Sequence, residues 1–107
     1  MTIIPKSLAD GQLPVAEGSL YVVPAVTQSI IKTVTLVNTD SVARTLNIYI
    51  KPSGGTSRRI VPKDLSLSAG YMAVLDDELT LEAGDDIRGD ASAADVVDYV
   101  VNGVERT

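Results

Sequence analysis

The 107-residue chain contains no Cys, His, Trp or Phe, and only four Tyr and two Met. The absence of Cys excludes a disulfide framework, a thiolate nucleophile and the usual thiolate zinc site. The absence of His excludes a Ser-His-Asp triad and leaves no side chain that titrates near pH 7 without a large pKa shift. We therefore expect a protein that is not an enzyme, with no catalytic residues, no metal ligands and no cofactor.

The hydrophobic residues that are present are mostly aliphatic. The chain holds 14 Val, 8 Ile and 10 Leu, and hydrophobic residues make up 45% of the sequence. Side chains branched at Cβ are stiff and fit the pleated surface of a sheet, so the excess of Val and Ile favours strands. The eight Gly and five Pro are spread along the chain and indicate frequent turns.

Alternation of apolar and polar residues marks the strands themselves. Leu46, Ile48 and Ile50 alternate with polar residues in the segment 44–51, and the segment 29–37 alternates in the same way. The turn-forming residues 38–41 lie between the two segments and predict a hairpin. Further short strands are expected at residues 20–23, 59–61, 71–75, 79–81, 86–88 and 96–104. The pattern predicts an all-β fold: a single antiparallel β-sandwich, immunoglobulin-like or jelly-roll-like, with about eight strands.

The N-terminal segment is expected to lie outside this sandwich. Pro5, Gly11 and Pro14 favour an extended arm over residues 1–17, followed by a sandwich domain over residues 18–107. Such an arm can add to the sheet edge of a neighbour, which makes Ile3, Ile4 and Pro5 candidate interface residues. We expect deletion of residues 1–14 to weaken assembly more than it lowers the melting temperature.

Residues 65–70 and 79–84 share the pattern Leu-x-Leu-x-Ala-Gly. In each copy both Leu are expected to enter the core, and Ala-Gly to form a tight turn in which Gly adopts a positive φ. Two hairpins with the same kind of turn explain this repeated six-residue pattern, which is too short for a solenoid repeat.

Charge is uneven along the sequence. Residues 1–63 carry a net charge of +4 and residues 64–107 carry −9. The protomer is polar if these halves occupy different faces, and the charges mix if strands from both halves interleave. The glycine-rich loop 51–59 ends in Arg58 and Arg59, which are candidate contacts to an acidic neighbour. Because the overall charge is −5 and no basic stripe exists, we expect no binding to nucleic acid.

Acidic side chains in the second half offer two alternative interpretations. They could coordinate calcium on flexible loops, or supply a carboxylate pair such as Asp77 and Glu82 for glycoside cleavage. Solvated hairpin turns explain the same residues without either function. The Arg88-Gly89-Asp90 tripeptide is explained by a bend within a strand. The acidic residues concerned are Asp76, Asp77, Glu78, Glu82, Asp85, Asp86 and Asp90.

The order of the strand and turn motifs resembles small structural proteins of tailed bacteriophages. The motifs are LYVVPA at residues 20–25, VTLVNT at 34–39, LNIYI at 46–50, LSLSAG at 65–70, LTLEAGDDIRG at 79–89 and VDYVVNGVE at 97–105. The resemblance implies a compact β-sandwich that is a non-enzymatic virion component. It carries no catalytic residues to transfer.

The leading expectation is therefore a capsid decoration or cement protein that binds the head surface. The alternatives are a tail-tip, tail-fibre or neck accessory protein, and a receptor- or glycan-binding module. We expect the partners to be the major capsid protein, or other virion proteins, and further copies of the chain in a homo-oligomer. No apolar run has the length of a signal peptide or a membrane helix, so we expect no membrane contact. The expected location is the virion, after assembly in the host cytoplasm.

Overall fold

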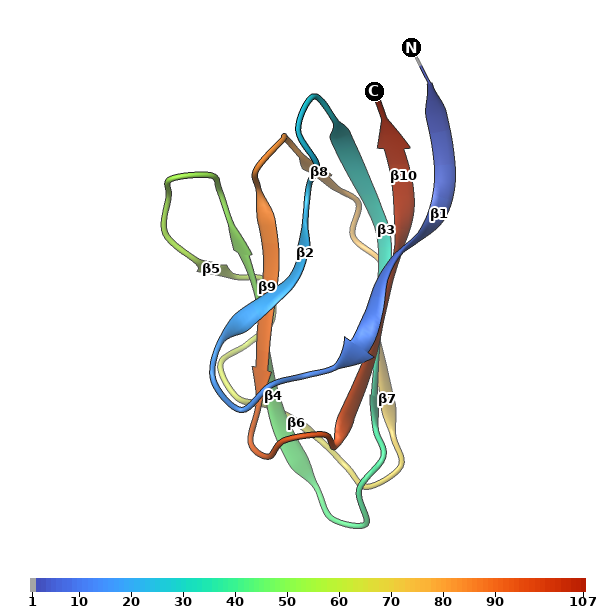
Figure 1. Ribbon diagram of the computed structural model, residues 1–107. Coiled ribbons are helices and arrows are strands. Elements are labelled where there is room, and N and C mark those ends of the chain that lie inside the picture. Colours follow the sequence, from blue (N-terminus) through green and yellow to red (C-terminus); the bar gives the residue numbers. More distant parts are fainter. Residues whose placement is uncertain (1) are drawn as a thin grey trace.

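Two antiparallel sheets face each other in the computed structural model, which describes residues 2–107 (Figure 1). The described residues form ten strands and no helix, so no membrane-spanning helix occurs among them. The strands are β1 (Ile3–Gln12), β2 (Gly18–Val22), β3 (Gln28–Asn38), β4 (Arg44–Lys51), β5 (Arg58–Arg59), β6 (Leu65–Leu67), β7 (Met72–Leu75), β8 (Leu79–Leu81), β9 (Asp86–Ala91) and β10 (Val97–Arg106). The predicted all-β sandwich is confirmed, with ten strands in place of about eight.

Each sheet contains five strands. The first, which we call sheet A, has the order β1-β10-β3-β7, and β8 also pairs with β3. The second, sheet B, has the order β2-β9-β4-β5, and β6 also pairs with β4. In sheet A, β7 pairs with residues 34–37 of β3 and β8 with residues 29–31, so the two short strands lie end to end along one edge. Most neighbours within a sheet are therefore distant in sequence.

The core between the sheets is aliphatic, as the composition predicts. Strand β3 contributes Ile31, Val34 and Leu36, and strand β4 contributes Leu46 and Ile48, each at most 1% exposed. These residues alternate with outward-facing neighbours, except at a bulge where both Lys32 and Thr33 stand between Ile31 and Val34. Burial of each core side chain stabilises the fold by about 1.5–3 kcal/mol. The same alternation in the sequence predicted both strands.

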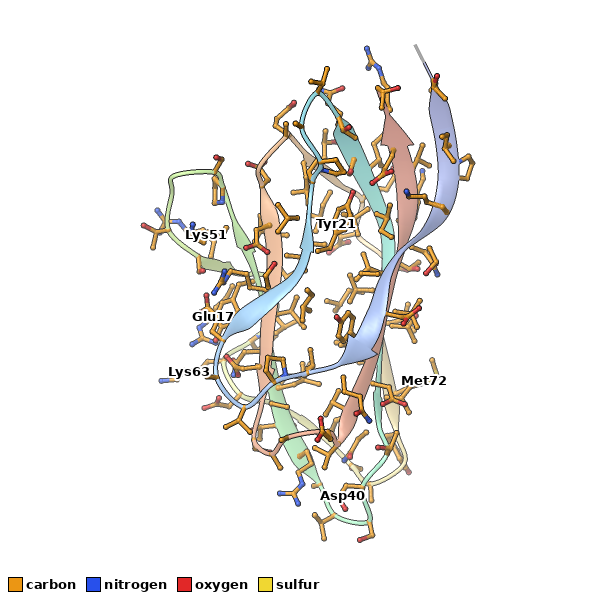
Figure 2. All side chains as sticks on the ribbon, viewed as in Figure 1. Glu17, Tyr21, Asp40, Lys51, Lys63 and Met72 are labelled. Carbon is orange, nitrogen blue, oxygen red and sulfur yellow. The ribbon has the colours of Figure 1, made fainter. Side chains whose placement is uncertain are left out.

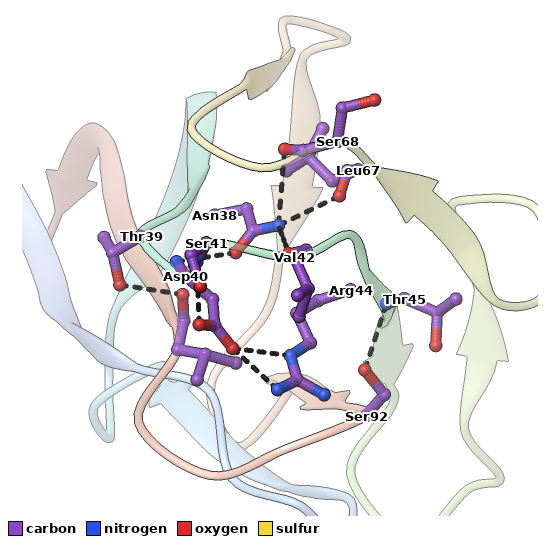
Figure 3. A network of polar contacts seen from close by, with 11 residues as sticks. Asn38, Thr39, Asp40, Ser41, Val42, Arg44, Thr45, Leu67, Ser68 and Ser92 are labelled. Carbon is purple, nitrogen blue, oxygen red and sulfur yellow. Dashed lines mark hydrogen bonds and ion pairs between the residues drawn. The ribbon is translucent and has the colours of Figure 1, made fainter.

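The predicted hairpin between β3 and β4 is wrong. Strand β3 belongs to sheet A and β4 to sheet B, so the connection over residues 39–43 crosses from one layer to the other. Asn38 fixes this crossing (Figure 3): its Nδ2 donates to the carbonyl oxygens of Val42 at 2.9 Å, Leu67 at 3.0 Å and Ser68 at 3.3 Å. Turn-forming residues signal a change of direction, but they do not say whether the chain returns to the same sheet.

The two Leu-x-Leu-x-Ala-Gly segments are also crossings between the sheets. Leu67 and Leu81 are buried, and Gly70 and Gly84 have φ values of +75° and +87°, as predicted. The first segment leads from β6 in sheet B to β7 in sheet A, and the second leads from β8 in sheet A to β9 in sheet B. The repeated motif is therefore a corner that transfers the chain to the opposite layer, and neither copy closes a hairpin.

The segment expected as an arm is extended, but it pairs with its own chain. Strand β1 runs antiparallel to β10 from Ile3 to Gln12, with a register shift between Ser7 and Ala9, and Leu13 is fully buried. Residues 3–12 are thus an edge strand of sheet A, not a free arm, and no boundary separates them from the sandwich at residue 17. Pro5 fits here because an edge strand tolerates a missing N–H.

Candidate interaction surface

The outer face of sheet B is polar and covered by its own side chains. Asn47 donates to Asp64 at 3.1 Å and to Asp90 at 2.9 Å, and the Tyr49 hydroxyl donates to Asp90 at 2.7 Å. Arg59 hydrogen-bonds Asn47, and its guanidinium lies 5.1 Å from the centre of the Tyr49 ring. Burial, and then the Asp90 carboxylate, raises the pKa of Tyr49. These groups satisfy one another across three strands and the loop that follows β5.

A second polar network continues along the same face. The Ser19 hydroxyl donates to Asp86 at 2.7 Å, and Arg88 makes ion pairs with Asp86 at 3.0 Å and Glu17 at 2.8 Å. A hydrogen bond from Ser57, and then Arg88, lowers the pKa of Glu17. The Arg88-Gly89-Asp90 tripeptide therefore lies inside β9, with its charged side chains already engaged.

The outer face of sheet A carries both apolar and polar side chains, and we call it the open face. Its outward side chains follow from the strand registers and the alternation of burial. They are Ile3, Pro5, Ser7, Asp10 and Gln12 of β1; Asp98, Val100, Asn102, Val104 and Arg106 of β10; Gln28, Ile30, Lys32, Thr33, Thr35 and Val37 of β3; Met72 and Val74 of β7; and Thr80 of β8.

Several apolar side chains of the open face are accessible to solvent. Met72 is 57% exposed, Val74 48% and Val100 36%. Figure 2 shows Met72 on the opposite side of the sandwich from Glu17 and Lys51. Exposed apolar side chains that gather on one face of a domain are typical of a surface that contacts another protein.

The structure places the five predicted interface residues at two separate edges. Ile3, Ile4 and Pro5 lie on β1 at the edge of sheet A, and Ile3 and Ile4 are 61% and 46% exposed. Arg58 and Arg59 form β5 at the edge of sheet B. Ile3 and Pro5 belong to the open face, whereas the two Arg do not, so the five residues do not form one site.

The end of the sandwich that holds both termini is tied by a buried phenol. The Tyr21 hydroxyl donates to Glu105 at 2.7 Å and lies 2.6 Å from the Ser29 hydroxyl, and Lys6 pairs with Glu105 at 2.7 Å. Burial raises the pKa of Tyr21 to about 12, while hydrogen bonds from Lys6 and then Tyr21 lower the pKa of Glu105. The contacts join β2 of sheet B to β1, β3 and β10 of sheet A.

The positive and negative halves of the sequence mix in space. Lys6 pairs with Glu105, Lys32 with Glu78, and Arg88 with Glu17, so each of these ion pairs joins the two halves. Each sheet contains strands from both halves, which decides between the two charge arrangements that the sequence left open.

The acidic residues considered for calcium are dispersed over separate partners. Within residues 2–107, no group of three or more acidic side chains lies close enough to hold a metal ion. Asp85 accepts hydrogen bonds from the backbone N–H groups of Ser53 and Glu82, and Asp90 is held by Asn47 and Tyr49. These carboxylates support turns and the polar face of sheet B.

Two hollows open at the edges of the sandwich. A cavity of about 270 Å³ is lined by Val34, Ile60, Leu75 and Leu79, with Asp77 as its acidic residue. A shallower groove of about 410 Å³ lies beside the C-terminal residues, next to Glu82. Asp77 and Glu82 therefore line different hollows and do not form an acid-base pair.

Sequence reasoning missed the open face, although a signal for it was present. The segments around Ile30 and Val100 carry apolar residues at consecutive positions, Ile30-Ile31 and Val100-Val101. Such runs place apolar side chains on both faces of a strand, whereas a strand with one solvated face alternates strictly.

Comparisons with known proteins bear on the fold. No protein-family model matches the chain, and no curated protein matches its sequence. A solved structure of infectious bursal disease virus, Gx strain, matches with a TM-score of 0.53 and 14% identity, over 97% of this chain and 32% of the viral chain. The Gt strain matches with a TM-score of 0.50 and 11% identity, over 97% of this chain and 30% of the viral chain. The protein thus spans about a third of those chains, with which it shares a β-sandwich fold.

Proposed function

We propose that this protein is a non-enzymatic structural component of a virus particle, and specifically a decoration protein on the capsid of a tailed bacteriophage. The open face carries the proposal, since the exposed side chains of Met72, Val74 and Val100 on one sheet face are most simply explained by contact with another protein. The choice of a phage particle rests on the order of motifs, which resembles that of phage structural proteins. The likeness to structures of infectious bursal disease virus supports a viral context.

The distribution of polar groups supports a contact role over a chemical one. The most extensive polar clusters, on the outer face of sheet B and around Tyr21, are engaged in hydrogen bonds and ion pairs within the chain. The 270 Å³ cavity offers mainly aliphatic side chains. A reaction requires a nucleophile, acid or base aimed at a site where substrate can lie, and the two hollows described above do not combine such groups.

The free edge of β1 is a second feature that suits assembly. An edge strand presents backbone N–H and C=O groups that can pair with a strand of a neighbouring protein. Ile3 and Ile4 stand on this edge with exposed side chains. In a particle, β1 and the open face together offer one continuous flank for contact.

Capsids assembled without this protein provide the test. The protein should bind them and raise the temperature at which they release DNA. Val74→Lys, on the open face, should weaken binding at least tenfold, because it places a charge within an apolar contact. Val22→Lys is the matched control: Val22 is 51% exposed on edge strand β2 of sheet B, close to the 48% of Val74, and its binding should stay within about twofold.

The proposal fails if the protein neither binds such capsids nor protects them, or if Val22→Lys weakens binding while Val74→Lys does not. Gold-labelled antibody on intact particles then separates the head surface from the tail. Label confined to the tail would replace decoration of the capsid with the tail-accessory role.

A further inference from the structure

Val26 has a strained backbone conformation in the turn between β2 and β3. Its φ is +58°, in the left-handed region, where a side chain branched at Cβ is an outlier. Within residues 2–107, the other non-glycine residues with a positive φ are Asp64 and Asp95. Asp tolerates this region because its short polar side chain can hydrogen-bond locally, whereas Val cannot. Strained residues of this kind gather at functional sites, which makes Val26 a candidate for one.

Buried contacts fix both ends of this turn. On one side, Val23 is 2% exposed, and its N–H donates to the carbonyl oxygen of Asp85 at 2.9 Å. On the other side, Thr27 is 7% exposed, and its Oγ1 donates to the carbonyl oxygen of Ala25 at 3.1 Å. Because both ends are held, the turn keeps the positive φ of Val26 and presents its side chain in a fixed direction.

Contacts within the chain do not explain why this position holds a valine. The Val26 side chain is 88% exposed, compared with 57% for Met72 on the open face, so it adds little to the core. Gly, Asn or Asp would adopt the same φ at lower cost and would lose almost no packing. A contact with another molecule explains the residue type, because only there does the apolar side chain become buried.

Val26 borders the open face, at the end of the sandwich that holds both termini (Figure 1). The groove of about 410 Å³ is lined by Val26 and Ala83, together with Gln28 and Arg106 of the open face. Glu82 also lines it and accepts hydrogen bonds from Gln28 Nε2 at 2.9 and 3.1 Å. Charges of both signs stand at the groove, so the exposed apolar side chain, and not a net charge, distinguishes this site. The groove leaves space beside Val26 for the wall of a partner's pocket.

We infer that Val26 anchors the capsid contact by inserting its side chain into an aliphatic pocket of the capsid protein. The contact offsets the strain, because burial of the two methyl groups is gained only in the bound state. A side chain held by a rigid turn loses little conformational freedom when it binds, which favours the complex. This inference rests on the proposed function, since Val26 extends the surface that the open face begins, and it adds the chemistry of the partner's site.

Two substitutions separate the apolar contact from the strain, with binding measured on capsids that lack the protein. Val26→Thr keeps the branched Cβ and the strain but replaces a methyl group with a hydroxyl group. The melting temperature of the free protein should change by less than about 2 °C, and binding should weaken about fivefold or more. Val26→Asn suits the positive φ, so it should raise the melting temperature by about 3 °C or more and weaken binding about tenfold or more.

Val42→Thr is the matched control. Val42 is 50% exposed in the connection over residues 39–43, at the end of the sandwich opposite the termini (Figure 1), and its φ is not positive. Only its backbone carbonyl oxygen takes part in the hydrogen bond from Asn38. The same exchange of a methyl group for a hydroxyl group should therefore leave capsid binding within about twofold of the wild type.

Wild-type binding by both Val26 variants overturns the inference. A Val26→Asn variant that is no more stable than the wild type also overturns it, because the position is then not strained. If the Val26 variants bind normally while Val74→Lys does not, the open face contacts the capsid without Val26, so this inference fails and the proposed function stands. If the wild type binds no capsids, both proposals fail.

Discussion

At the scale of single residues, Asn38 holds the crossing between the two sheets through its side-chain hydrogen bonds. It is fully buried, donates to three carbonyl oxygens and accepts a hydrogen bond from the Asp40 N–H at 2.9 Å (Figure 3). In the sequence it is one of four turn-forming residues, and its neighbours Thr39, Asp40 and Ser41 look equally suited to the role. Only the structure shows which of the four closes the corner.

Asn38→Ala should destabilise the protein by about 2–4 kcal/mol, because several buried backbone groups lose their partner. For a domain of this size the melting temperature should fall by roughly 10–25 °C. The control is Asn102→Ala, since Asn102 is exposed on the open face and should contribute less than about 0.5 kcal/mol. Thermal unfolding at low protein concentration measures both, and equal effects would show that the buried contacts of Asn38 do not stabilise the corner.

Tyr21 and Glu105 should give stability a dependence on pH at both extremes. The pKa of Tyr21 is raised to about 12 in the folded protein, so its contribution is complete below the unfolded value near 10 and is lost as the pH rises to about 12. The pKa of Glu105 is lowered, so its contribution is present above the unfolded value near 4.3 and is lost as the pH falls through the folded value.

Chemical denaturation across pH tests this assignment. Tyr21→Phe should be less stable than the wild type at pH 7 and should lose less further stability between about pH 10 and 12. Glu105→Gln should flatten the acid limb below about pH 5. Tyr71→Phe controls for the loss of a phenol, since Tyr71 is 67% exposed. An alkaline limb that Tyr21→Phe leaves unchanged would assign it to Tyr49 or Tyr99, whose pKa values burial also raises.

At the scale of elements, β1 departs furthest from the sequence interpretation. Pro5, Gly11 and Pro14 gave reason to expect a free arm, yet β10 accepts β1 along its whole length. The reason is that β10 has polar backbone groups on both sides, and β3 pairs with only one of them. No local pattern in residues 1–17 reveals that the backbone groups of β10 need a partner, because β10 lies about ninety residues away in the sequence.

Two truncations should separate the two halves of β1. Removal of residues 1–14 deletes all of β1 and Leu13, so we now expect a large fall in melting temperature, of about 15 °C or more. Removal of residues 1–5 leaves Lys6 to pair with Glu105 and should lower the melting temperature by less than about 5 °C. Near-equal melting temperatures for the wild type and the longer truncation would restore the original expectation of a free arm.

The strands and corners show what local sequence specifies at this scale. Strand β4 was placed correctly at residues 44–51, because three apolar residues alternate with polar ones, and β8 was placed correctly at residues 79–81. The two Ala-Gly turns were also predicted, with the positive φ of Gly70 and Gly84. These features depend on residues within a few positions of one another, so they are readable without the fold.

At the scale of the whole molecule, pairing between distant strands creates the two unlike faces. Residues of the open face come from β1, β3, β7, β8 and β10, and the polar face behind it comes mainly from β4, β5 and β9. Strand pairing also brings the positive and negative halves of the sequence together in space, since ion pairs such as Lys6–Glu105 join the two halves. The candidate surface is a property of sheet order and cannot be assigned to any one motif.

The sequence alone determined the chemistry that the protein lacks, the aliphatic core and the position of most strands. These follow from composition and from two-residue alternation, which are local. The tertiary structure alone decided which sheet each strand joins, that Asn38 and the two Ala-Gly corners carry the chain across, and that β1 completes sheet A. The physical reason is that alternation divides each strand into two faces but does not select its neighbours. The neighbours are selected by the collective burial of apolar side chains and the pairing of backbone groups across the whole chain.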